Sequence, residues 1–312
     1  MKWSIAIFSS RESLDTLVGS VGAVLGATTD AIATIDVVVN GNQALSSDIA
    51  RYVEALRPGD RAATLMRVWY IPVADKAHAW NQYLRDIWEK SDVAFFVDGY
   101  TQVMPDALQL ISEGLRAKPN ALAASGVPSI GRSSSVLREQ MLREGGLHGN
   151  LFAVRGDVLE QMRTIGFQLP VGMYRVDGTL GAVICFALDP AKNDWDPSRV
   201  LVHPRATWLF NPLNWRSAAH VRAHFNRVMR QAQGVLENLA VREHLAIQKR
   251  APQDLPRTSA ELVLTWIRSF PLAAAKAFVK NPICLIAAHR LRRPRDWTYR
   301  TAPAVLVSRA AL

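Results

Sequence analysis

The first half of the chain alternates short apolar runs with segments whose apolar positions recur every three or four residues. Apolar runs predict buried strands, and the helical spacing predicts amphipathic helices that pack on them. The predicted strands are Ser4–Phe8, Ile35–Val39, Leu65–Ile71 and Val93–Val97, and the predicted helices are Leu14–Leu25, Asp48–Leu56, Lys76–Glu89 and Pro105–Ala117. This order predicts an α/β fold with a mostly parallel sheet and helices on both faces.

The alternation loosens after residue 120. Ala121–Val127 and Gly149–Val154 read as strands, and the polar segment between them, Gly131–Gly146, is expected to be mobile. Further on we predict helices at Val158–Ile165 and Val176–Cys185, strands at Val200–Val202 and Ala206–Phe210, a long amphipathic helix from Trp215 to about Gln248, and three short helical segments separated by prolines. The chain is therefore predicted to have a domain over residues 1–210 and a helical appendage over residues 211–312.

Charge separates these two parts. The net charge is +10, yet residues 1–210 carry 20 basic and 22 acidic side chains, whereas residues 211–312 carry 17 basic and 5 acidic ones. This distribution argues against a uniformly basic nucleic-acid binder, and no nucleic-acid partner is expected. The appendage combines Arg290, Arg292, Arg293 and Arg295 with Trp266, Phe270, Phe278 and Trp297. That pattern suits an anionic membrane surface, and the alternative is a docked helical cap with a solvated basic face.

The chain ends and the cysteines bear on the compartment. The apolar run Met1–Phe8 is too short for a signal peptide, and no stretch approaches the roughly 18 to 20 apolar residues that span a bilayer. The nearest candidate, Pro271–His289, is interrupted by lysines. Two cysteines, Cys185 and Cys284, fit a reducing compartment. We expect a cytoplasmic protein that is either soluble or peripheral on the inner face of the cell membrane.

Polar residues follow each of the first four predicted strands, at Ser9–Ser13, Asn40–Asn42, Pro72–Lys76 and Asp98–Tyr100. Ligands of open parallel sheets lie beyond the carboxyl ends of the strands, so these segments are expected to line one crevice. The chain lacks a phosphate loop, a dinucleotide fingerprint, a nucleophile elbow and paired zinc ligands. This argues against the nucleotide hydrolases, Rossmann dehydrogenases, serine hydrolases and zinc proteins.

Four blocks resemble the nucleotide-sugar glycosyltransferases of the inverting family 2, which have the GT-A fold. They are Ser4–Ser13, Ile35–Asn42, Lys76–Asn81 with Ser91–Tyr100, and Leu147–Arg155. The resemblance implies transfer of a hexosyl group from a nucleotide sugar to an envelope glycan or a lipid-linked acceptor. Among nucleotide sugars, a UDP-sugar is the favoured donor. The Gln-x-x-Arg-Trp sequence of processive members is absent, which favours a non-processive enzyme.

The resemblance also implies roles for individual residues. The donor is expected to contact Ser9, Ser10, Arg11, Glu12, Asn40, Lys76, Asn81, Asp98, Gly99 and Tyr100. The acceptor or the diphosphate is expected to contact His148, Gly149, Arg155 and Arg175. Asp98 would hold Mg²⁺ or Mn²⁺, with His203 as a second ligand, and Asp177 would be the general base. Two carboxylates of the family's motifs are missing, because Tyr100 ends the Asp-x-Asp motif and Val176 precedes Asp177.

Each assignment has a plainer structural alternative. Asp98 would end a strand at a turn, Asp177 would cap a helix, and His203 would pack before Pro204. Lys76 would begin a helix, and Asn81 would have no special role. Two alternative functions follow from the missing carboxylates and the sheet: a degenerate glycosyltransferase that serves as a binding or scaffold subunit, and a nucleotidyltransferase.

Overall fold

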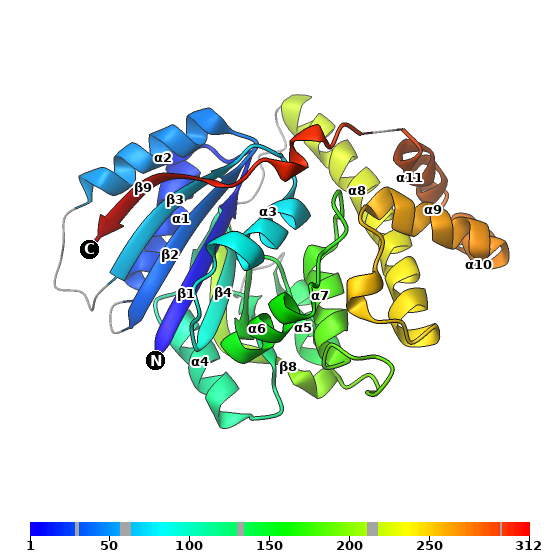
Figure 1. Ribbon diagram of the computed structural model, residues 1–312, viewed down its shortest axis with the longest axis horizontal. Coiled ribbons are helices and arrows are strands. Elements are labelled where there is room, and N and C mark those ends of the chain that lie inside the picture. The colour runs from blue at the N-terminus through cyan, green and yellow to red at the C-terminus, as the bar shows by residue number, and fades with distance from the viewer. Residues whose placement is uncertain (29–30, 57–63, 130–133, 211–217, 294) are drawn as a thin grey trace.

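The computed structural model describes residues 1–28, 31–56, 64–129, 134–210, 218–293 and 295–312. Within these residues the strands form one nine-stranded sheet in the order β5-β8-β6-β7-β4-β1-β2-β3-β9 (Figure 1). The strands are β1 Lys2–Ser9, β2 Ile32–Asn40, β3 Thr64–Ile71, β4 Val93–Asp98, β5 Thr101–Val103, β6 Ala123–Pro128, β7 Leu151–Arg155, β8 Val200–Phe210 and β9 Val305–Ala311. Strands β3, β2, β1 and β4 are parallel, as the alternating pattern predicted.

Helices cover both faces of the sheet. They are α1 Leu14–Gly26, α2 Gln43–Ala55, α3 Lys76–Gln82, α4 Ala107–Ala117, α5 Ser135–Glu144, α6 Gly156–Thr164, α7 Val176–Cys185, α8 Ala218–Arg242, α9 Ser259–Ser269, α10 Pro271–Lys280 and α11 Ile283–Leu291. Side chains alternate between the two faces of a strand, so Ile5 and Ile7 join a core with α1, α2 and α4. Ala6 and Phe8 join a second core with α3 and α6 to α11. The predicted α/β fold class is confirmed.

Some local expectations were wrong or incomplete. The polar segment expected to be mobile contains helix α5, which buries Met141. The two strands predicted around residue 203 are one strand, β8, with a register shift in its pairing to β6. Strands β5 and β9 were not predicted. Trp215, the predicted start of the long helix, lies outside the described residues, and the described helix begins at Ala218.

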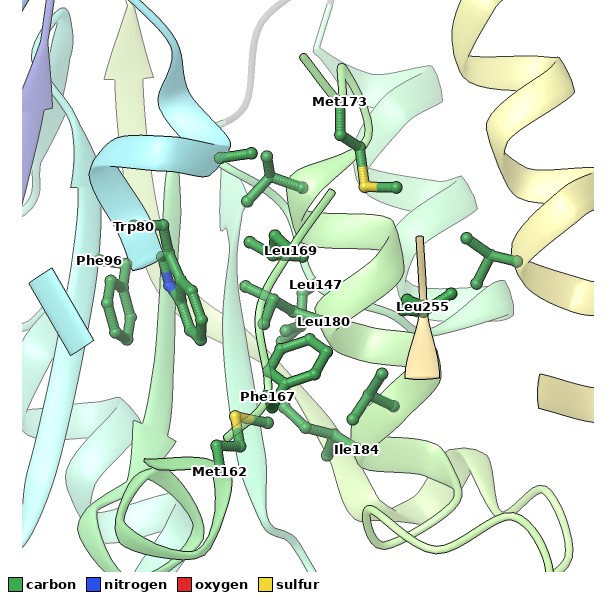
Figure 2. Close-up of a cluster of buried hydrophobic side chains, with 14 of the residues drawn as sticks. Trp80, Phe96, Leu147, Met162, Phe167, Leu169, Met173, Leu180, Ile184 and Leu255 are labelled. Atoms are coloured by element: carbon green, nitrogen blue, oxygen red, sulfur yellow. The ribbon is translucent and has the colours of Figure 1, made fainter. Parts of the chain in front are cut away.

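The C-terminal region shares the second core with the first part of the chain. Trp80 and Phe96 lie in the same cluster as Leu236, Trp266 and Cys284, which come from α8, α9 and α11. Figure 2 shows part of this cluster, with Trp80 and Phe96 on one side of Leu169, Phe167 and Leu180. The last strand, β9, pairs antiparallel with β3 at the edge of the sheet (Figure 1). The division at residue 210 stays a prediction, and its boundary, 211–217, lies outside the described residues.

A buried ion pair joins β2 to β3. The Arg67 guanidinium donates to both carboxylate oxygens of Asp36, at 2.7 and 3.0 Å, and Trp69 Nε1 donates to the same carboxylate at 2.9 Å. Asp36 is fully buried. Burial raises its pKa, although the hydrogen bond and charge of Arg67 act in the opposite direction. Arg67 also bonds the Glu89 carboxylate and the Ile87 carbonyl, so the pair ties β2 and β3 to the segment after α3 and is a structural element.

Candidate active site

The ends of β1 and β4 meet closely at the carboxyl edge of the sheet. Phe8 pairs with Asp98, and the Gly99 amide donates to the Phe8 carbonyl at 2.8 Å. A β-carbon at Gly99 would lie 2.8 Å from Ser9 Cβ and 3.0 Å from the Phe8 carbonyl oxygen, so only glycine fits there. This contact aligns the loop after β1 with Asp98.

Glu12 organises the loop after β1. One of its carboxylate oxygens accepts hydrogen bonds from the Ser9 hydroxyl at 2.7 Å, the Ser10 amide at 2.7 Å and the Arg11 amide at 2.9 Å. Asn40, at the end of β2, bridges the Ser9 carbonyl at 2.9 Å and the Asp75 amide at 3.1 Å through its side-chain amide. Five residues predicted to lie near the donor are therefore brought together, although these contacts fix the loop and leave the Arg11 side chain exposed.

Asp98 lies at the centre of a polar cluster. Its carboxylate forms an ion pair with Lys76, the first residue of α3, and accepts a hydrogen bond at 3.0 Å from the Tyr100 hydroxyl. The same hydroxyl lies 3.0 Å from Asn150 Oδ1. Burial lowers the pKa of Lys76, but the nearby carboxylates, Asp98 above all, outweigh it and the pKa is raised. Burial and Asp98 raise the pKa of Tyr100. The cluster thus holds a charged ammonium and a protonated phenol.

Asp177 joins this cluster through Gly149. Its Oδ2 accepts a hydrogen bond at 2.9 Å from the Gly149 amide, and its Oδ1 accepts one at 3.0 Å from the amide of Gly178 in its own helix. A methyl group at Gly149 would lie 3.3 Å from Lys76 Nζ, 3.4 Å from Asp98 Oδ2 and 3.6 Å from Asp177 Oδ2. Three charged groups therefore surround one small space. Asp177 lies in the first turn of α7, and Arg175 occupies the cap position.

His148 lies beside the same space. Its ring stacks on Trp208, with the ring centroids 5.1 Å apart, and its Nδ1 accepts a hydrogen bond from the Asn150 amide at 3.3 Å. Burial lowers the pKa of His148, while the charges of Asp177 and Asp98 act to raise it. The imidazole is consequently a neutral, positioned ring next to the two carboxylates.

Three predicted residues lie elsewhere. Arg155 pairs with Val93 because β7 runs antiparallel to β4, so it lies about 16 Å along the strand from Asp98. It bonds Asp157 instead. Asn81 is buried, and its side-chain amide bonds both backbone groups of Leu169, each at 2.8 Å. Both residues therefore have these hydrogen bonds outside the cluster around Asp98.

His203 also lies away from Asp98. Its Nδ1 accepts hydrogen bonds from the amides of Arg205 and Ala206, at 3.3 and 3.2 Å, and its ring lies against Gly114 of α4. Burial lowers its pKa, and the charges that act on it include Asp106 and Glu113 of the α4 region. The packing alternative fits these contacts, and the assignment of His203 as a metal ligand beside Asp98 does not.

The donor set around Asp98 does not fit a resident Mg²⁺ or Mn²⁺ ion. Such ions need several oxygen ligands, but the Asp98 oxygens are engaged by an ammonium and a phenol hydroxyl. Asp177 Oδ2 and Glu12 Oε2 are likewise bonded to donors. Within the described ranges, no three His, Cys, Asp or Glu side chains gather in a way that would hold a metal ion. The positive charge beside Asp98 is that of Lys76.

Glu237 and Asp75 also support the site. Asp75 lies in the predicted strand-end segment Pro72–Lys76, but neither residue was given a role from the sequence. Glu237, buried on α8, accepts hydrogen bonds from the amides of Tyr174 and Arg175, just before Asp177. Asp75 caps α3 through the His78 amide at 2.8 Å and accepts a bond from the Gly172 amide at 3.0 Å. For Glu237, the only signal in the sequence was that an acidic residue lies within a long predicted amphipathic helix.

Comparisons with known proteins support the fold. No protein-family model matches the chain, and no curated protein is similar to it in sequence. Among solved structures, it is similar to the mannosyltransferase PcManGT from Pyrobaculum calidifontis in complex with GDP-Man and Mn²⁺, at 18% identity and a TM-score of 0.52, covering 96% of this chain and 82% of that one. It is also similar to residues 1–349 of TarS from S. aureus in complex with UDP-GlcNAc, at 12% identity and a TM-score of 0.52, covering 93% and 80%. These likenesses show a GT-A-like fold.

Proposed function

We propose that the chain is a non-processive, inverting glycosyltransferase that moves a hexosyl group from a nucleotide sugar to an envelope glycan or a lipid-linked acceptor. The observation that carries this proposal is the convergence of Lys76, Asp98 and Asp177 around Gly149, at the edge of the sheet where such folds bind ligands. The nucleotide-sugar complexes of the two similar structures, GDP-Man and UDP-GlcNAc, support the donor class.

We assign roles to two residues of this cluster. Asp177 takes the proton from the acceptor hydroxyl as its oxygen forms a bond to the sugar C1, because its carboxylate faces the space beside Gly149. The bond between C1 and the phosphate oxygen breaks, and negative charge develops on the leaving nucleoside diphosphate. Lys76, oriented by Asp98, stabilises that charge with its ammonium group. Transfer of this kind is expected to persist in the presence of EDTA.

The test uses the full chain and water as a slow acceptor. Release of UDP or GDP from UDP-glucose, UDP-GlcNAc and GDP-mannose is measured together with donor binding by calorimetry. We expect Asp177→Asn to lower the release rate by about 10²–10⁴ with unchanged donor binding. Lys76→Met should lower the rate by about 10²–10³. Exposed Lys118→Met is the matched control.

Each other result has a defined meaning. Near-normal turnover by Asp177→Asn would refute its role as the base. Abolition of turnover by EDTA and its recovery with Mn²⁺ would refute the role of Lys76 as the principal positive charge. Release of pyrophosphate from a nucleoside triphosphate would favour a nucleotidyltransferase. Absence of binding by any nucleotide would favour a binding or scaffold subunit.

We further propose that α10 and α11 contact an anionic membrane on the inner face of the cell. Leu272 and Val279 are 80% and 85% exposed, and Lys276 lies between them on the same face of α10. Apolar side chains beside cations suit a bilayer interface. Among the described residues, no single helix has the length and apolar character to cross a membrane; α9 and α10 do so only together, with a bend of 108°.

Surface variants test this proposal better than truncation, because α8 to α11 belong to the second core. Co-sedimentation with vesicles of phosphatidylcholine and phosphatidylglycerol is expected to fall at least fivefold for the Leu272→Ser/Val279→Ser double variant. Val136→Ser, at an exposed apolar position on α5, should bind like the unchanged protein. Equal binding by the double variant would refute contact through this face.

A further inference from the structure

A basic pocket lies beside the candidate active site, between the loop after β1 and helices α8 and α11. Its volume is about 290 Å³, and four arginines line it: Arg11, Arg230, Arg290 and Arg295. Among the described residues that line the pocket, none is acidic. Four guanidinium groups around one pocket repel one another, so a bound anion would relieve an unfavourable concentration of charge.

Two contacts orient this pocket toward the acceptor side of the site. Arg230 lies over the Tyr174 ring, 5.7 Å from its centroid, and the Tyr174 backbone is held by Glu237 three residues before Asp177. Arg295 lies against Gly172: a methyl group there would be 3.7 Å from its Nη1. The segment Gly172–Arg175 therefore separates the pocket from Asp177.

The arginine set fits a phosphate or diphosphate group, which offers several acceptor oxygens and more than one negative charge to the four guanidinium groups. The planar guanidinium group donates two parallel hydrogen bonds that match phosphate oxygens, and it stays charged at all accessible pH values. The Arg290 guanidinium also lies over the Phe225 ring, 5.7 Å from its centroid, which limits its conformational freedom at the pocket. Lys76, which we assign to the donor diphosphate, does not line the pocket.

We propose that this pocket binds a phosphate or diphosphate group carried by the acceptor. The inference rests on the proposed function, because it names the acceptor class of that same site. The acceptor would be a sugar phosphate or a lipid-linked phosphate, held by the arginines while its hydroxyl reaches Asp177. Ile286, half exposed one helical turn before Arg290, gives the pocket an apolar neighbour next to its charged wall.

The test uses inorganic pyrophosphate as the probe and the full chain in calorimetry, with saturating UDP or GDP to fill the donor site. Pyrophosphate is expected to bind in the presence of the nucleotide. The Arg290→Gln/Arg295→Gln double variant should weaken it tenfold or more. Lys76→Met should leave it within twofold, and so should Arg292→Gln/Arg293→Gln, whose exposed arginines lie outside the pocket.

The outcomes separate this proposal from the proposed function. Two results would overturn the proposal that the pocket binds a phosphate group of the acceptor. They are unchanged pyrophosphate binding in the Arg290→Gln/Arg295→Gln variant and loss of pyrophosphate binding when the nucleotide is added. If the chain binds pyrophosphate through these arginines but binds no nucleotide, the proposed phosphate site is upheld and the proposed glycosyltransferase function is overturned. Competition by glucose 1-phosphate points to a soluble acceptor, and competition only by phosphatidic acid in phosphatidylcholine vesicles points to a lipid-borne one; both uphold the pocket.

Discussion

Glu237 connects the C-terminal helices to the segment that carries Asp177, and its conversion to glutamine gives a sharp prediction. The side chain is fully buried. Oε2 accepts from the amides of Tyr174 and Arg175, both at 3.0 Å. Oε1 accepts from the Ser259 hydroxyl at 2.6 Å, Gln233 Nε2 at 2.7 Å and the Tyr174 amide at 3.1 Å. Every contact of this carboxylate is that of an acceptor.

Glu237→Gln keeps the shape and replaces one acceptor oxygen with a donor. If the new NH₂ replaces Oε2, it faces two backbone amides. If the new NH₂ replaces Oε1, the Ser259 hydroxyl can rotate and accept a hydrogen bond from it. The Gln233 side chain cannot adapt in this way, because its Nε2 also donates to the Gly172 carbonyl at 2.9 Å, so two NH₂ groups face each other. At least two hydrogen bonds to a charged acceptor are lost, each worth about 1.5–3 kcal/mol. We expect the free energy of unfolding to fall by about 3 kcal/mol.

The measurement is urea unfolding of the full chain followed by tryptophan fluorescence. Glu139→Gln, at an exposed position of α5, is the matched control and should change the free energy of unfolding by no more than about 0.5 kcal/mol. The rate of nucleoside diphosphate release should also fall in the Glu237 variant with little change in donor binding, because the segment before Asp177 loses its anchor. A loss of stability no larger than that of the control would refute the reasoning.

Three further predictions follow from buried polar groups. Asn81→Ala leaves both backbone groups of Leu169 without their side-chain partner and should lower the free energy of unfolding in urea by about 2–4 kcal/mol. Binding of the nucleotide-sugar donor, measured by calorimetry, should not change. A selective loss of that binding would instead indicate that Asn81 contacts the nucleotide sugar. Asp36→Ala removes the fully buried partner of Arg67, which keeps its ion pair with the more exposed Glu89, and should cost about 3 kcal/mol in the same assay; a loss below about 1 kcal/mol would contradict a structural ion pair. Burial lowers the pKa of four histidines below 6.5: His78, His148, His203 and His244. Because the unfolded chain therefore binds protons at a higher pH than the folded chain, the free energy of unfolding should fall as the pH drops below about 6.5. Thermal unfolding measured from about pH 8 to pH 5 would refute this if the midpoint temperature rose.

Much of the cluster around Asp98 was predictable from the direction of the strands alone. Parallel strands present their carboxyl ends at one edge, so residues after β1, β2, β3 and β4 had to be neighbours. The same argument fails where direction is not visible in the pattern. Arg155 follows Leu151 in an apolar run that looks like the others, but β7 is antiparallel and carries it to the opposite edge.

Residues whose partners are backbone groups far along the chain left no readable signal. Glu237 bonds amides 62 and 63 positions away, and Asn81 bonds Leu169 across 88 positions. Any segment offers the same amides and carbonyls, so no side-chain motif marks the partner. The arginine pocket was inaccessible for a related reason, since Arg11 is separated from Arg290 by most of the chain. The sequence located the basic excess but not the surface that it forms.

The Tyr100 hydroxyl and the Lys76 ammonium together match the charge of Asp98. Two adjacent carboxylates repel and therefore require a cation of higher charge between them. Here the Tyr100 hydroxyl donates a hydrogen bond to Asp98, where a second carboxylate would repel it. Asp98 then carries a single negative charge, which one ammonium balances. Asp98, Tyr100 and Lys76 consequently form a charge-balanced cluster, in which the positive charge belongs to the chain itself.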